Sequence, residues 1–210
     1  MDKQFAIFDM DGTLIDSMVF WKNLATEYLT CKGVREIPAE ILEQIKPMTM
    51  SESAALFHAE FGLTGDIESE MNAMMDDHYC KDIPLKPGVR EYLQKLHARG
   101  IRMCVASATA EYLMDACLTR LGVRDYFDFL LSCETVGVGK RSPLVYHESA
   151  RRLNASPAEI AVYEDALYAV QTAKAAGYYV VGVYDHSAAE NWSAFAQEAD
   201  ELILNWEDAT

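Results

Sequence analysis

Two aspartates stand close together near the start of the chain, directly after a short apolar run. Residues 5–8 are apolar, and Asp9, Asp11 and Gly12 follow them. Such a run predicts a buried strand, and ligands of an open parallel sheet bind outside the carboxyl ends of its strands. Carboxylates placed there can attack a substrate, transfer protons or hold a metal ion. For two aspartates alone, an ordinary Asp-Gly turn is the more frequent explanation.

Polar residues also follow three later apolar stretches. They are Ser107 and Ala108, Lys140, and the acidic pair Glu164 and Asp165. A lysine offsets the repulsion between an attacking carboxylate and an anionic substrate, and carboxylates with water are the ligands that Mg²⁺ prefers. Taken one at a time, each has an ordinary structural explanation: the serine lies in a turn, the lysine lies on the surface, and the acidic pair begins a helix. Those explanations would have to coincide at four strand ends, so we infer one site.

The second part of the chain must supply the elements that position these residues. From residue 84 onward, helical and strand patterns alternate, which is typical of a parallel sheet with helices on both faces. We therefore expect an α/β, Rossmann-like core. Its predicted helices are 88–99, 110–121, 143–153, 166–176 and 188–198, and its later strands are 101–106, 127–131, 160–163, 178–183 and 201–204. Thr109 is a candidate N-cap for the second of these helices.

Residues 17–83 show helical periodicity and no strand pattern. Predicted helices run from about residue 18 to 33, from 38 to 45, from 51 to 61 and from 66 to 79. Asp16 and Ser17 have N-cap chemistry for the first of them. Proline and glycine at positions 87 and 88 mark a junction. We therefore predict a core domain of residues 1–16 and 84–210 that carries an inserted all-helical cap, residues 17–83.

Composition limits the classes of partner. The 210 residues are 50% hydrophobic, which suits a globular protein, and the formal net charge is −15. This charge argues against nucleic acid or an anionic membrane surface as a partner, because both need clustered basic residues. The five scattered cysteines form no metal or disulfide pattern, and no signal or membrane segment is recognised. We expect a cytoplasmic monomer with a small-molecule substrate.

The polar strand ends resemble the motifs of one family. Residues 9–13, DMDGT, resemble the first motif of the haloacid dehalogenase superfamily in its phosphotransferase form. The resemblance implies that Asp9 attacks phosphorus and that Asp11 is the general acid and base. Ser107 and the Ala108 backbone resemble the second motif, which holds phosphate oxygens. Lys140 matches the third-motif lysine.

The later motifs depart from the family pattern in places. Arg141 and Leu144 stand where the third motif usually has proline and aspartate, whereas Pro143 and Tyr146 are kept. Glu164 and Asp165 resemble the fourth motif, although Ala166 replaces a common serine. The resemblance implies a Mg²⁺ site made by Asp9, the backbone carbonyl of Asp11, Asp165 and Glu164.

The predicted cap resembles that of the beta-phosphoglucomutase and phosphoglycolate phosphatase branch. Trp21 stands near the position of a histidine in the mutases, and Met50 near that of a phosphate-binding arginine; Lys46 or Arg141 could compensate. A mutase needs a residue that binds the second phosphate of its substrate. The absence of this residue favours hydrolysis over isomerisation of a phosphorylated sugar. We therefore expect a Mg²⁺-dependent phosphatase of a small metabolite, with Trp21 and Met50 contacting the substrate. The alternatives are a sugar-phosphate mutase and a non-catalytic phosphate-binding protein.

Overall fold

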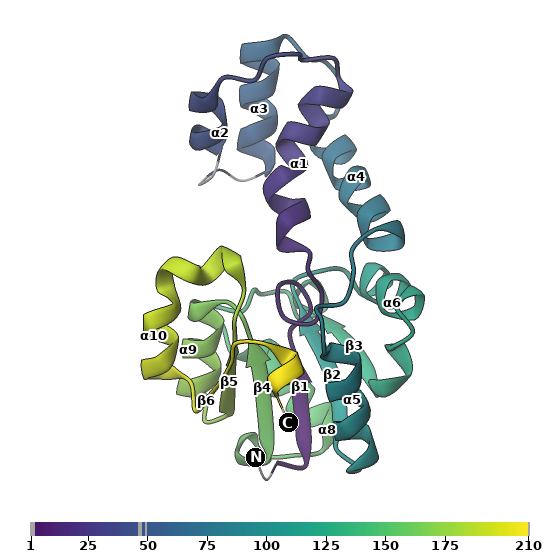
Figure 1. Cartoon of the computed structure of the whole chain (residues 1–210), viewed down its shortest axis with the longest axis vertical. Helices are drawn as coiled ribbons and strands as arrows, with labels where there is room; N and C mark the ends of the chain where they lie inside the picture. The colour runs from purple at the N-terminus through teal and green to yellow at the C-terminus, as the bar shows by residue number, and fades with distance from the viewer. Residues whose placement is uncertain (1–2, 46–47, 49, 210) are drawn as a thin grey trace. The chain divides into compact units, whose positions relative to one another are not determined.

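The computed structural model describes residues 3–45, 48 and 50–209. The chain divides into two compact units. One consists of Met1–Met18 and Ile83–Thr210, and the other of Val19–Asp82. Each unit has its own buried side chains; the first combines strands with helices, and the described part of the second contains helices and no strand (Figure 1).

A six-stranded sheet forms the centre of the first unit in the described part of the chain (Figure 1). Its strand order is β3-β2-β1-β4-β5-β6, and every neighbouring pair is parallel. Chain order therefore reverses at the central strand β1, which is where ligands bind in open α/β sheets. The predicted α/β fold class is confirmed. The strands are β1 Phe5–Phe8, β2 Arg102–Ser107, β3 Phe129–Ser132, β4 Ile160–Glu164, β5 Tyr179–Val183 and β6 Glu201–Ile203.

Successive residues of β1 face opposite sides of the sheet, as the period of a strand requires. Ile7 belongs to a core shared with helices α8 Leu144–Leu153, α9 Leu167–Ala175 and α10 Trp192–Glu198. Phe8 belongs to an aromatic cluster on the other face, where its ring stacks on Tyr163 with centroids 4.2 Å apart. Tyr92 of helix α5 Val89–Ala98 covers this cluster, and its hydroxyl lies 2.8 Å from that of Tyr163.

The predicted elements are present, with ends that differ by one or a few residues; one α-helix and three short 3₁₀-helices of the described residues were missed. The sequence showed no signal for α7 Cys133–Val136, a single turn too short for helical periodicity. Ser132 caps it by accepting a hydrogen bond from the Glu134 amide at 3.1 Å. The predicted helix 188–198 is in fact a 3₁₀-helix, His186–Asn191, followed by α10.

Two of the side chains predicted to cap helix starts, Thr109 and Ser17, do not do so. Helix α6 Glu111–Arg120 has Ala110 at its N-cap, and Thr109 instead donates its hydroxyl to Asp11. The hydroxyl of Ser17 is buried and has no hydrogen-bond partner among the described residues, so it caps nothing. Short polar side chains before a helix can bond elsewhere when a nearer acceptor is available.

Helices alone form the second unit in the part of the chain that the structure describes. They are α1 Met18–Cys31, α2 Ala39–Ile45, α3 Met50–Phe61 and α4 Ile67–Lys81. The buried side chains of α1, Leu24, Ala25, Tyr28 and Leu29, recur at helical spacing. Met71 and Met75 of α4 are buried as well, so these methionines are core residues. Asp66 caps α4 by accepting a hydrogen bond from the Ser69 amide at 3.0 Å.

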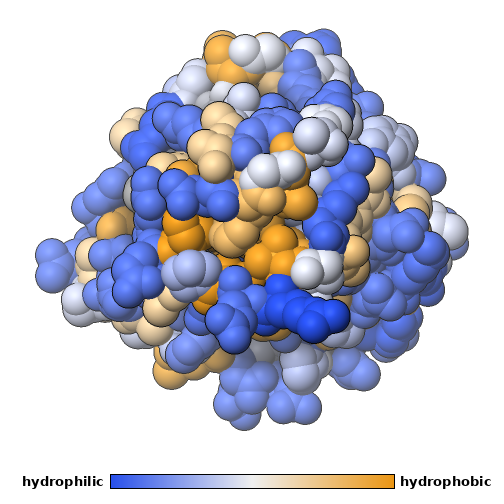
Figure 2. Space-filling model, turned by 90° about the horizontal axis from the view of Figure 1, so that it is seen from above, coloured by the Kyte–Doolittle hydropathy of each residue, from blue (hydrophilic) through white to orange (hydrophobic). Residues whose placement is uncertain are grey.

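The surface carries some apolar side chains. Figure 2 shows one face of the molecule, on which hydrophilic residues surround a patch of hydrophobic ones. Several large hydrophobic residues are exposed, among them Val19 and Trp21 at the start of α1. Among the described residues, no helix combines the length and the apolar character that crossing a membrane requires.

Candidate active site

The carboxyl ends of the neighbouring strands β1 and β4 bring three carboxylates together. Phe8 pairs with Tyr163 in the sheet, and Asp9 and Glu164 directly follow this pair. The amide of Asp9 donates to the carbonyl of Tyr163 at 3.0 Å. Asp9, Glu164 and Asp165 each offer an oxygen, and these oxygens lie within 4.8 Å of one another. All three side chains are buried, so we call this group the carboxylate cluster.

Lys140 lies against the carboxylate cluster. Its Nζ contacts Asp9 Oδ1 and donates to Glu164 Oε1 at 2.7 Å. Tyr146 donates its hydroxyl to the same Glu164 oxygen at 2.7 Å. Burial alone lowers the pKa of Lys140, but Asp9 and Glu164 raise it above its ordinary value, so the amine is a fixed cation. The structure therefore places this predicted residue beside Asp9.

The three carboxyl groups of the cluster can carry more negative charge than one lysine neutralises. Burial raises the pKa of Asp9, against the lowering effect of Lys140. It also raises the pKa of Glu164 to about 7, and that of Asp165 well above its usual range. Desolvation disfavours uncompensated negative charge, and a cation bound among these oxygens removes that cost. Buried carboxylate oxygens at this spacing are a donor set that suits a hard divalent cation.

The loop after β1 is shaped around Asp165. Gly12 has a φ of 76°, and a Cβ at this position would lie 2.9 Å from Asp165 Cγ, closer than side chains approach. Thr13 donates its hydroxyl to Asp165 Oδ1 at 3.1 Å. The indole of Trp206, near the end of the chain, donates to the carbonyl of Thr13 at 3.1 Å. These contacts hold the loop that carries Asp11.

Two hydroxyl groups at the carboxyl end of β2 lie against Asp11. Thr109 donates to Asp11 Oδ2 at 2.6 Å, and Ser107 lies 3.5 Å from the same oxygen. The hydroxyl of Ser107, in turn, accepts from the Thr109 amide at 3.2 Å. Ala108, between them, is exposed. Sequence reasoning missed Thr109 as a site residue, because a threonine after a strand gives the same signal as a helix cap.

The remaining predicted residues belong to the helical unit. Trp21 is 37% exposed, and its indole donates to the hydroxyl of Tyr79 at 3.2 Å. Met50 is half-buried at the first position of α3. Lys46 lies outside the described residues. The contact of Trp21 and Met50 with a substrate therefore stays a prediction.

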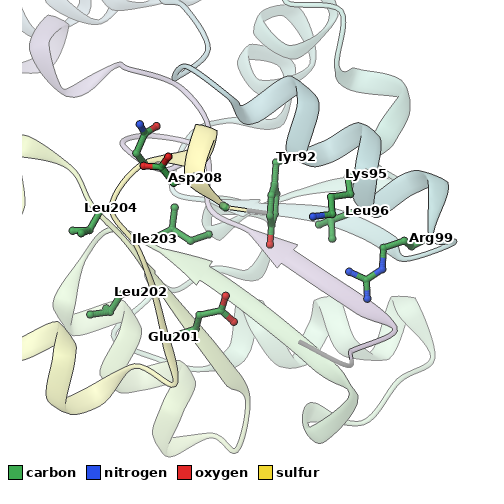
Figure 3. A pocket seen from close by; sticks show the side chains of 11 residues that line it. Tyr92, Lys95, Leu96, Arg99, Glu201, Leu202, Ile203, Leu204 and Asp208 are labelled. Carbon is green, nitrogen blue, oxygen red and sulfur yellow. The ribbon is translucent and has the colours of Figure 1, made fainter.

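The described residues form a hollow away from the predicted site as well as one beside it. A hollow of about 320 Å³ lies between α5 and β6. In Figure 3, Tyr92, Lys95 and Arg99 lie on one side of it and Glu201 on the other. None of the predicted site residues lines it. A second hollow, of about 610 Å³, is lined by Lys140 and its neighbours. Lys140 alone of the predicted site residues lines it, so the candidate active site is the carboxylate cluster, and this hollow lies beside it.

Comparisons with known proteins point to one family. Residues 4–177 match the sequence model of the haloacid dehalogenase-like hydrolases. Beta-phosphoglucomutase of Bacillus subtilis is 30% identical over 188 residues, which cover 84% of this chain and 81% of the relative. Hexitol phosphatase B of Escherichia coli is 29% identical over 175 residues, 81% of this chain and 79% of the relative. A phosphorylated carbohydrates phosphatase of Thermotoga maritima is 27% identical and covers 95% of both chains.

Solved structures share the fold over nearly the whole chain. The crystal structure of a putative beta-phosphoglucomutase from Thermotoga maritima superimposes with a TM-score of 0.81. It is 24% identical, and the match covers 98% of this chain and 95% of the other. A predicted phosphoglycolate phosphatase from Haemophilus somnus has a TM-score of 0.79 at 19% identity, over 100% of this chain and 97% of the other.

Proposed function

The chain belongs to the haloacid dehalogenase-like hydrolase family, and from this premise we propose that it hydrolyses the phosphate monoester of a small metabolite, a sugar phosphate or a similar compound. The predicted family and enzyme class, a phosphoric monoester hydrolase, are confirmed by the family match and by relatives that are phosphatases. The observation that carries the proposal is the convergence of Lys140 with the carboxylate cluster at the central strand.

Asp9 is the proposed nucleophile. One of its oxygens forms a bond to phosphorus while the ester oxygen leaves, which produces an aspartyl-phosphate. Lys140 contacts Asp9 and is fixed by Glu164, so its charge offsets the repulsion between the carboxylate and the incoming phosphate. Ser107 and the Ala108 amide, at the end of β2, are proposed to hold the other phosphate oxygens.

Asp11 is the proposed general acid and base. It gives a proton to the leaving alkoxide in the first half-reaction and takes a proton from the water that hydrolyses the aspartyl-phosphate in the second. The proton is therefore returned in each cycle, and the products are the alcohol and inorganic phosphate. Thr109 holds Asp11 Oδ2 at 2.6 Å, which orients the carboxyl group toward this task.

Mg²⁺ is the proposed cofactor, because the donor set of the carboxylate cluster fits it. Asp9, Asp165 and Glu164, with the backbone carbonyl of Asp11, are the proposed ligands. When bound, the ion offsets the negative charge of the phosphate and of the cluster. Thr13 and Gly12 keep Asp165 in place for this role.

A sugar-phosphate mutase is the second candidate, supported by the beta-phosphoglucomutase relative. A mutase must hold a bisphosphate intermediate while it turns over. By the resemblance to the mutases, Trp21 and Met50 stand near the positions of a histidine and of a phosphate-binding arginine, and both are uncharged here. Hydrolysis remains the leading proposal because the similar proteins include hexitol phosphatase B and a phosphorylated carbohydrates phosphatase. The helical unit is proposed to act as the cap, and a cytoplasmic location and a monomeric state stay predictions from the sequence.

One assay tests the proposal and separates the two candidates. The protein is incubated with Mg²⁺ and a panel of sugar phosphates, glycerol phosphates and phosphoglycolate, and both released phosphate and isomerised sugar phosphate are measured. We expect phosphate release that Asp9→Asn abolishes. Isomerised product without net phosphate release would favour the mutase. Binding of the esters without either product would favour the non-catalytic alternative.

A further inference from the structure

Adjacent basic residues, Lys140 and Arg141, have opposite surroundings. Lys140 is 6% exposed and lies in the carboxylate cluster. Arg141 is exposed, and its guanidinium carbon lies 4.8 Å from the ring centroid of Tyr168. Tyr168 lies in the first turn of α9, three residues after Asp165. A guanidinium over an aromatic face gains a cation–π attraction that limits where the side chain goes.

In the described part of the chain, Arg141 makes no ion pair with a carboxylate; Arg90 makes none either, but its guanidinium donates to the carbonyls of Leu121 and Gly122. Arg102, Arg124, Arg151 and Arg152 each pair with an aspartate or glutamate. Arg141 has neither kind of partner among the described residues. Its donors are available to a ligand, while Tyr168 holds the guanidinium from one side.

The guanidinium lies at a hollow next to the proposed catalytic lysine. Val138, Gly139, Lys140, Arg141, Ser142 and Tyr168 line this hollow of about 610 Å³. Gly139 and Ser142 are small, and a Cβ added at Gly139 would meet no atom within 4 Å. Asp9, Glu164 and Asp165 do not line this hollow, so a group of the substrate bound there would lie beside the carboxylate cluster and not within it.

We infer that Arg141, held by Tyr168, binds a second anionic group of the substrate, a carboxylate or a second phosphate. The inference rests on the proposed function and names the class of ester that this site prefers. A guanidinium presents parallel donors that match both groups in a bidentate arrangement, which a lysine cannot reproduce. Elsewhere the site is acidic, so Arg141 supplies positive charge for the part of the substrate that Lys140 does not reach.

The test compares esters that differ only in the second group. In the first arm of the test, phosphoglycolate is paired with 2-hydroxyethyl phosphate, which lacks the carboxylate. In the second arm, fructose 1,6-bisphosphate is paired with fructose 1-phosphate, which lacks the second phosphate. The measured quantity is the ratio of kcat/KM within each pair. We expect the wild-type protein to favour the doubly anionic ester in at least one arm. In that arm, Arg141→Gln should lower the ratio by about 10- to 100-fold, the range of a charged hydrogen bond.

Further variants separate binding from structure. Arg141→Lys should recover part of the ratio, Tyr168→Phe should keep most of it because the ring remains, and Tyr168→Leu should lower it. Arg151→Gln is the matched control, because Arg151 is an exposed arginine of α8 that pairs with Glu148. This control should leave the ratio at the wild-type value.

Two failures have different meanings. Phosphate release with equal ratios in wild type and Arg141→Gln overturns this inference and leaves the proposed function standing. A wild-type preference for the singly anionic esters in both arms also overturns it. Absence of phosphate release from every ester overturns the proposed function, and this inference with it.

Discussion

Two ion pairs of the same length show how differently the two units use charge. In the sheet unit, Lys140 and Glu164 are 2.7 Å apart, and their side chains are 5% and 1% exposed. In the helical unit, Lys32 and Glu70 are also 2.7 Å apart, but their side chains are 36% and 41% exposed. An exposed pair contributes about 0–1 kcal/mol, whereas breaking a buried pair costs about 3–5 kcal/mol.

The difference follows from the elements that carry the charges. Strand ends of a parallel sheet converge, so carboxylates from β1 and β4 are buried together and need a cation. Helix surfaces diverge into solvent. In the helical unit, His78 shows this pattern: it contacts Glu27 at 3.0 Å and Asp82 at 2.9 Å, and both carboxylates are largely exposed. The buried charges on which the proposed chemistry depends lie in the sheet unit, so we expect mutations there to have the larger effects.

The largest effect should come from the nucleophile. Asp9→Asn removes the attacking oxygen's charge, so we expect kcat to fall by about a thousand-fold or more in a folded protein.

Asp11→Asn leaves Asp9 able to attack but slows proton transfer. With an activated aryl phosphate, which needs little protonation, Asp11→Asn should accumulate phosphate on Asp9, measured as a mass increment on the intact protein. Turnover by Asp9→Asn would contradict the covalent mechanism.

The two ion pairs themselves provide the next contrast. Lys140→Met leaves Asp9 and Glu164 buried without their cation, so we expect loss of activity and a lower free energy of unfolding, by about 3 kcal/mol. Lys32→Met removes only an exposed pair and should change the free energy of unfolding by less than about 1 kcal/mol. Chemical denaturation at neutral pH measures both. Equal losses in the two variants would contradict the comparison.

Stability should depend on pH and on Mg²⁺ through the carboxylate cluster. Burial raises the pKa of Glu164 from 4.5 to about 7, and it also raises those of Asp9 and Asp165. A raised pKa in the folded state favours the protonated form. In the metal-free protein the contribution of Glu164 to stability is therefore fully present below its ordinary pKa of 4.5 and is lost as the pH rises through about 7.

Thermal unfolding with and without Mg²⁺ measures this dependence. Because the ion replaces protons, its stabilisation should be larger at about pH 8 than at about pH 5. Asp165→Asn should reduce this stabilisation strongly, and Glu164→Gln should reduce it less. Stabilisation by Mg²⁺ that is the same at both pH values would argue against binding at the cluster.

A smaller effect is expected from Thr109, which acts through Asp11. Thr109→Val removes the hydroxyl that holds Asp11 Oδ2 at 2.6 Å, so kcat should fall by about 10-fold with little change in KM. Thr109→Ser keeps the hydroxyl and should recover most of the rate. The pH profile of kcat should shift in the valine variant alone. Unchanged kcat and pH profile would show that Asp11 is positioned without Thr109.

The smallest effect on the chemical step is expected from the helical unit. Trp21→Ala and Met50→Ala should change KM and the ranking of substrates, by a few-fold, while kcat for the best substrate changes little. Steady-state kinetics over the substrate panel measures this. Trp21→Phe, which keeps an aromatic ring, is the control. A collapse of kcat for every substrate in a folded variant would place a catalytic group in this unit.

Local patterns were enough to predict much of the sheet unit. Apolar runs that end in Asp9, Ser107 and Glu164 identified β1, β2 and β4, because a buried strand and its polar end are adjacent in the chain. The same patterns could not distinguish a cap from a site residue at Thr109. They also missed α7, a single turn that has no periodicity to detect.

The sequence by itself determined which side chains could carry phosphate chemistry and which sheet would hold them, since both depend on short runs of neighbouring residues. Only the tertiary structure decided which of these side chains touch. Trp206 supports the Thr13 carbonyl from 193 positions away, Thr109 turns to Asp11, and Arg141 lies on Tyr168. Such contacts depend on how distant elements pack, and hydrophobic periodicity specifies the face of an element but not its partner.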